Sequence, residues 1–118
     1  MREDASESEF QQAIIDAAAV YRWMVWYQPD WVYRLIMRDM RQRRVRRDWP
    51  EPGFPDLWLV HPENGKLLVF ECKSQRGSVR DAQKRWVAAL KAAGVDVRVV
   101  RPRDFDDVLA LLSGSDEQ

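Results

Sequence analysis

The chain has 118 residues and no formal net charge, because 19 basic side chains balance 19 acidic ones. This length, with 46% hydrophobic residues, fits one compact domain over residues 1–118, and the composition does not suggest a disordered chain. No apolar run approaches the ~20 residues that cross a bilayer, and the single Cys72 excludes an internal disulfide. Because the polar N-terminus does not resemble a secretory signal, we expect a cytoplasmic protein without a membrane partner.

The charges are distributed unevenly along the chain. Residues 1–9 carry four acids and one base, and residues 104–118 carry five acids and no base. The intervening residues 10–103 hold 18 bases and 10 acids, a net charge of +8. Fifteen of the bases are arginines, whose planar side chain binds two phosphate oxygens at once. The pattern therefore favours a nucleic-acid partner despite the zero total.

The N-terminal part, residues 7–48, is predicted to be helical and basic. Ser6 and Glu9 have the spacing of a capping box, and the apolar residues that follow recur at helical intervals, which predicts a helix over about 7–24. A second helix is expected at about 31–47, before several prolines end any helix. A run of one charge repels itself unless an anion is near, so we expect this segment to contact nucleic-acid phosphates. Its arginines are Arg34, Arg38, Arg41, Arg43, Arg44, Arg46 and Arg47.

The rest of the chain reads as strands and helices. Strands are predicted at 56–60 and 66–73, and the Asn64-Gly65 turn between them indicates an antiparallel hairpin. Ser78 and Asp81 have capping-box spacing and open a predicted helix that ends at about Ala93. Alternating valines predict a strand at 95–100, parallel to the strand before the helix, and a last helix is expected at 104–112. This order predicts an α/β fold, a small mixed β-sheet flanked by helices, with its core at about 53–112.

Three residues stand out as candidates for chemistry. Glu71 and Lys73 are two apart in a predicted strand, so both project from one face while Cys72 faces the other way. The hairpin brings Asp56, at the start of the partner strand, beside Glu71. Two adjacent carboxylates suit a hard divalent cation such as Mg²⁺, and a lysine beside it suits phosphodiester hydrolysis. The spacing alone also fits an ordinary solvated pair on an exposed strand.

Residues 53 to about 101 resemble the VRR-NUC branch of the PD-(D/E)xK nucleases, through the runs GFPDLWLV, LLVFECKS and RDAQKRWVAALKAAGVDVRVV. The G-x-P-D turn is 53–56, the E-x-K strand is 71–73, the early-helix glutamine is Gln83, and the V-x-V-V-R strand is 97–101. The chain departs from the family at Ser74-Gln75-Arg76, where many members have Gly and Pro. That departure concerns the loop beside the site and hence substrate preference.

The resemblance implies a restriction-endonuclease-like core and a Mg²⁺-dependent endonuclease, with Mn²⁺ able to replace Mg²⁺ and no small-molecule cofactor. Asp56 and Glu71 would be metal ligands, with the backbone carbonyl of Cys72 as a third. Lys73 would be the catalytic lysine, and Gln83 would position it or the scissile phosphate. Members of this branch often carry a metal-supporting glutamate in the first helix. Glu9 is the candidate here, although a capping-box acid explains it equally well, and Gln83 also fits an exposed helix residue.

Other residues have structural interpretations. Of the six tryptophans, Trp58 and Trp86 follow apolar patterns and are expected in the core, while the other four flank the arginine segment. These four either stack on bases or pack a homodimer interface, and we favour the dimer. His61 is expected in a loop and Cys72 as a buried thiol. The four flanking residues are Trp23, Trp26, Trp31 and Trp49.

We therefore expect an endonuclease that acts on branched or structured DNA such as Holliday junctions. Stand-alone VRR-NUC proteins of this size resemble junction-resolving enzymes of phages or bacteria, and two-fold pairing would supply the two active sites. Arg76 and Arg80 are expected to carry the DNA backbone toward the site. Two alternatives are a non-catalytic DNA-binding module with a nuclease fold and a nuclease subunit that depends on a partner protein.

Overall fold

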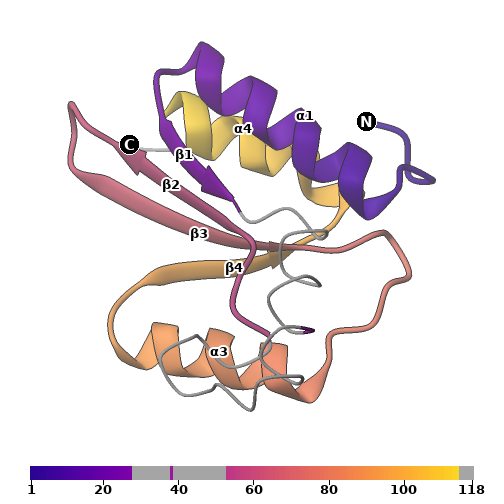
Figure 1. Cartoon of the computed structure of the whole chain (residues 1–118). Helices are drawn as coiled ribbons and strands as arrows, with labels where there is room; N and C mark the ends of the chain where they lie inside the picture. The colour runs from indigo at the N-terminus through magenta and orange to yellow at the C-terminus, as the bar shows by residue number, and fades with distance from the viewer. Residues whose placement is uncertain (28–37, 39–52, 115–118) are drawn as a thin grey trace.

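The computed structural model describes residues 1–27, 38 and 53–114 (Figure 1). Within these ranges the chain forms α1 (Glu7–Val20), β1 (Met24–Tyr27), β2 (Leu57–His61), β3 (Lys66–Cys72), α3 (Asp81–Ala92), β4 (Asp96–Val100) and α4 (Phe105–Ser113). A short 3-10 turn, Pro102–Asp104, precedes α4. The helix predicted at about 31–47 lies outside the described residues, apart from Arg38.

The four strands form one mixed sheet in the order β1-β2-β3-β4. β1 pairs antiparallel with β2, β2 antiparallel with β3, and β3 parallel with β4. The predicted hairpin is confirmed, because His61 pairs with Lys66. Gly65 closes the turn with φ +68°, and its backbone amide donates a hydrogen bond to the His61 carbonyl oxygen. The parallel pairing of β3 and β4 through the α3 crossover is also confirmed. The fold is thus α/β and consistent with a restriction-endonuclease-like core.

The prediction that the first helix extends to Met24 was wrong. Ser6 and Glu9 do form the capping box at its start, but the helix ends at Val20. Arg22 adopts a left-handed conformation with φ +67°, and the Trp23 amide bonds to the Ala18 carbonyl, a pattern that closes helices. The next four residues then pair with β2 as β1.

The start of α3 also differs from its prediction. The helix begins at Asp81 with Arg80 as the N-cap, so Ser78 does not cap it. The side chain that reaches back is Gln83, whose Oε1 accepts a 2.9 Å hydrogen bond from the Arg80 amide. The helix ends at Ala92, near its predicted end.

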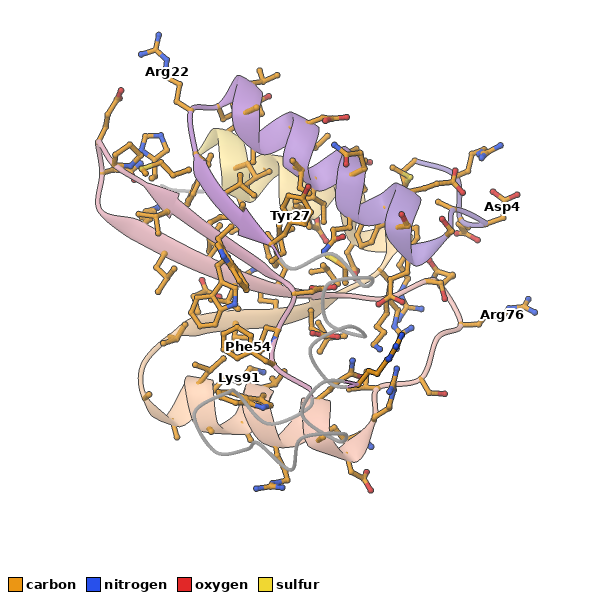
Figure 2. All side chains as sticks on the ribbon, viewed as in Figure 1. Asp4, Arg22, Tyr27, Phe54, Arg76 and Lys91 are labelled. Atoms are coloured by element: carbon orange, nitrogen blue, oxygen red, sulfur yellow. The ribbon has the colours of Figure 1, made fainter. Side chains whose placement is uncertain are left out.

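The sheet lies between two helical layers, with α1 and α4 on one face and α3 on the other (Figure 1). The main core fills the α1–α4 side and includes Phe10, Ile14, Phe70 and Val108, all buried. On the α3 side, Phe54 stacks on Trp58 and meets Trp86 edge to face (Figure 2). No helix among the described residues is long and apolar enough to cross a membrane.

Trp23 belongs to this core, which corrects its assignment to a stacking or dimer surface. It is 6% exposed, and its indole Nε1 donates a 2.9 Å hydrogen bond to the Leu112 carbonyl. Trp26 on β1 remains half exposed, whereas Trp31 and Trp49 lie outside the described residues. Trp58 and Trp86 are only partly buried, and Cys72 is a fully buried free thiol, as expected.

Candidate active site

The start of β2 and the end of β3 bring the predicted acidic residues together. Leu57 pairs with Phe70, so Asp56 stands next to Glu71 at the same end of the hairpin. Asp56 Oδ1 accepts a 3.3 Å hydrogen bond from the Cys72 amide. This bond fixes the aspartate against β3. The role of the Cys72 carbonyl as a metal ligand stays a prediction.

Lys73 lies among carboxylates in the interior. Its side chain is 6% exposed, and Nζ lies 3.8 Å from Glu71 Oε1. A second carboxylate, Glu7 in the first turn of α1, lies 4.0 Å from the same nitrogen. The amide of Lys73 bonds to the Val100 carbonyl on β4, which continues the parallel ladder past the end of β3. The lysine is therefore held by backbone and side-chain contacts together.

Three carboxylates converge beside this lysine. Glu7, Asp56 and Glu71 each offer one oxygen, and the three oxygens lie within 4.8 Å of one another. Glu7 comes from α1, which packs on the sheet through Phe10 and Ile14. These two residues follow Glu7 by three and seven positions, so Glu7 lies on the side of the helix that meets the sheet, although its side chain is about half exposed.

Glu9, the glutamate chosen from the sequence, lies outside this cluster. Its carboxylate accepts a hydrogen bond from the Ser6 amide and contacts Arg2. The hydrogen bond from the Ser6 amide lowers the pKa of Glu9, an exposed group. Residues two apart in a helix do not face the same way, so Glu9 points away when Glu7 points inward. The sequence carried the signal for Glu7 in its spacing from Phe10 and Ile14.

Gln83 links α3 to the carboxylate cluster. Its Nε2 donates a 2.7 Å hydrogen bond to Glu71 Oε1, while its Oε1 accepts from the Arg80 amide. The G-x-P-D turn packs against the same point: a Cβ on Gly53 would lie 2.6 Å from the Ala82 carbonyl carbon and 2.7 Å from the Gln83 amide nitrogen. Only glycine allows this approach, and its φ of +103° adds to that requirement.

Asp56 and Glu71 have raised pKa values. Burial raises the pKa of Asp56 from 3.8 to about 7, against the lowering effect of the Cys72 amide. Burial, and then the charge of Asp56, raises the pKa of Glu71 from 4.5 to about 8. Both shifts arise because carboxylates lose hydration and repel one another in the interior. Perturbed acids of this kind are typical of functional sites.

The residues present fit a divalent metal. Glu71 Oε2 is a buried atom for which the described part of the chain supplies no hydrogen-bond partner. Buried carboxylate oxygens are normally satisfied, so this one suits a cation. Three carboxylates with oxygen donors match the preference of hard divalent ions.

The predicted DNA-binding arginines are only partly placed. Arg38, Arg76 and Arg80 are exposed. Arg76 points away from the body of the protein on the loop after β3 (Figure 2). The remaining arginines of the 34–47 segment lie outside the described residues.

Comparison with known proteins identifies the family to which the chain belongs. The model of the VRR-NUC domain matches residues 5–104. The chain is also similar to the Fanconi-associated nuclease 1 homolog of Schizosaccharomyces pombe, with 40% identity over 47 residues. That match covers 40% of this chain and 7% of the fission-yeast protein. No solved structure matches the chain. Because the domain match spans most of the chain, the protein belongs to the VRR-NUC family of nucleases.

Proposed function

We propose that this nuclease is a divalent-metal-dependent endonuclease, with Mg²⁺ as the metal, that hydrolyses phosphodiester bonds in branched or structured DNA. The observation that carries the proposal is the convergence of the exposed Glu7, the partly buried Asp56 and the buried Glu71 beside Lys73. A structural role alone does not explain why Asp56 and Glu71 lose hydration side by side with a third carboxylate, Glu7, next to them, because their mutual repulsion is costly.

Each residue of the cluster has a separate role in this proposal. Glu7, Asp56 and Glu71 would hold the metal, which when bound activates water and neutralises charge on the phosphate. Lys73 Nζ supplies a positive charge and hydrogen-bond donors to the reacting phosphate or water. Gln83 orients Glu71 through its 2.7 Å hydrogen bond, so it acts on the geometry of the cluster.

The choice of branched DNA rests on the family resemblance and on the need for two cuts. One chain with one site cuts one strand, whereas a two-fold pair presents two sites. We therefore propose a homodimer. Size-exclusion chromatography with light scattering would show twice the mass of the 13.9 kDa chain, and a monomer at working concentration would contradict this part.

A panel of labelled DNA structures tests the substrate. Four-way junctions, flaps, nicked duplex and plain duplex are each incubated with the isolated chain in Mg²⁺ or in EDTA. We expect internal cuts in branched DNA that require Mg²⁺. Binding without cutting would favour a non-catalytic module, and activity only after adding a partner protein would favour a dependent subunit.

A further inference from the structure

The loop that leaves the catalytic strand forms a tight turn. It follows Lys73 directly, and the Gly77 amide bonds to the Ser74 carbonyl at 3.2 Å across residues 74–77. Arg76 stands near the tip of this turn and is exposed (Figure 2). These residues lie outside the sheet, so their remaining carbonyl groups need partners from elsewhere.

Arg101 supplies those partners. Its Nη1 lies 2.6 Å from the Gly77 carbonyl oxygen, 2.8 Å from that of Ser74 and 3.4 Å from that of Gln75. A second contact joins the same two segments, because Gln75 Oε1 accepts a 3.1 Å hydrogen bond from the Arg103 amide. The turn is thus attached to the segment after β4 at two independent points.

The sheet register places Arg101 beside the catalytic strand. Cys72 pairs with Val100, and the Lys73 amide bonds to the Val100 carbonyl at 3.0 Å. Arg101 therefore follows β4 at the same level at which Lys73 follows β3. Its own amide donates to the Asp104 carboxylate, which fixes the backbone from which the guanidinium extends.

The chemistry of this contact differs from that of a surface charge. Three carbonyl oxygens gather at one guanidinium nitrogen, and no described carboxylate forms an ion pair with Arg101. Carbonyl dipoles directed at a cation are mutually repulsive without it, so the charge holds them together. Removing the side chain takes a charged hydrogen-bond donor away from these part-buried carbonyl oxygens.

We propose that Arg101 is a positioning residue that fixes the 74–77 turn, so that Arg76 meets a DNA phosphate next to Lys73. This proposal rests on the proposed DNA substrate. It gives the 74–77 turn a role in holding the DNA. In this proposal Arg76 contacts the DNA, and Arg101 acts by fixing the turn that carries Arg76.

Amide hydrogen exchange tests the first half of the proposal without DNA. Arg101→Ala should speed exchange at residues 74–77 at least tenfold while the amides of β2 and β3 stay protected. Arg103→Ala is the matched control, since it removes an equal charge two residues away but keeps its backbone amide. Unchanged exchange in a folded Arg101→Ala protein would overturn the proposal.

A double-mutant cycle tests the second half, using junction DNA in EDTA and fluorescence anisotropy. Arg76→Ala should raise the Kd about fivefold in the parent protein, the effect of one charge-assisted hydrogen bond, and less than about twofold in the Arg101→Ala background. Arg101→Lys keeps the positive charge but loses the planar guanidinium group. It should also reduce the rise in Kd that Arg76→Ala causes. Additive effects of the two substitutions, or full retention of the Arg76 effect in Arg101→Lys, would contradict positioning. Absence of DNA binding by the parent protein would instead refute the proposed substrate, and exchange would still decide whether Arg101 holds the turn.

Discussion

Gln83 Nε2 donates a 2.7 Å hydrogen bond to Glu71 Oε1, and the same side chain accepts from the Arg80 amide at the start of α3. The amide therefore spans from the helix to the carboxylate cluster with both of its polar ends used. A glutamine fits this place because one end must donate and the other must accept. Gln83 is thus a residue through which α3 orients Glu71.

Replacing Gln83 by alanine should lower kcat/KM about tenfold to a hundredfold, as expected when a hydrogen bond to a charged group is lost. The protein should remain folded, because Gln83 is only partly buried. Cleavage kinetics of labelled DNA measure the effect. Lys91→Ala, at the exposed end of α3, is the control and should leave the rate unchanged. Equal rates for Gln83→Ala and Lys91→Ala would show that the bond to Glu71 does not matter.

For two glutamates of the first turn of α1, we predict opposite effects of substitution on Mg²⁺ affinity. Glu7→Gln should weaken Mg²⁺ binding about tenfold or more, because it removes one of three converging carboxylates. Glu9→Gln should leave Mg²⁺ affinity unchanged and at most cost about 1 kcal/mol of stability through the capping box. Isothermal titration of Mg²⁺ into each variant measures this. Loss of affinity in Glu9→Gln with retention in Glu7→Gln would restore the original assignment.

The raised pKa values predict how stability depends on pH. The pKa of Asp56 rises from 3.8 to about 7 and that of Glu71 from 4.5 to about 8, so the folded state binds protons that the unfolded state releases. The stability that these two acids contribute by binding protons is fully present below about pH 4. The free energy of unfolding then falls as pH rises to about 8. Mg²⁺ binds the deprotonated carboxylates, so its stabilising effect should grow over the same range.

Thermal unfolding at about pH 5 and pH 8.5, in EDTA and in Mg²⁺, checks this prediction. In EDTA the Tm should be lower at the higher pH, and Mg²⁺ should recover most of the difference. Asp56→Asn should reduce the pH dependence because it removes one titrating group. A Tm in EDTA that rises between these two pH values would contradict the raised pKa values.

Gly53 and Gly65 provide a matched pair for testing the packing of the G-x-P-D turn. Both have positive φ, but a Cβ on Gly65 meets nothing within 4 Å, whereas one on Gly53 meets the α3 backbone. Gly65→Ala should therefore cost about 1 kcal/mol of stability, the conformational penalty alone. Gly53→Ala should cost about 2–3 kcal/mol more and also weaken Mg²⁺ binding, since α3 carries Gln83. Urea unfolding and titration calorimetry separate the effects, and equal stability losses for the two variants would disprove the close packing.

The features that the sequence predicted well depend on local signals. The Asn64-Gly65 turn specifies the hairpin. The pairing of β2 with β3 in this hairpin places Asp56 beside Glu71. The two-residue period places Glu71 and Lys73 on one face. The parallel pairing of β4 follows from the crossover helix.

The features that it missed depend on contacts between distant segments. The four residues of β1 form a short apolar run, which periodicity cannot distinguish from the end of a helix. The resemblance implies a glutamate in the first helix, for which Glu9 is the candidate in the sequence, whereas the packing of α1 on the sheet brings Glu7 beside Asp56 and Glu71. The Arg101 contacts join residues 24 to 27 positions apart, and no local pattern predicts them.

The most direct test of the account is cleavage of labelled branched DNA by the parent protein, Asp56→Asn and Lys73→Met, each in Mg²⁺ and in EDTA. The parent protein should cut only with Mg²⁺, and both variants should lose at least about a thousandfold in rate while binding the DNA as well as the parent does. Circular dichroism confirms that the variants are folded. Cleavage by either folded variant at the rate of the parent protein, or cleavage in EDTA, would contradict the assignment of this cluster as a metal-dependent active site.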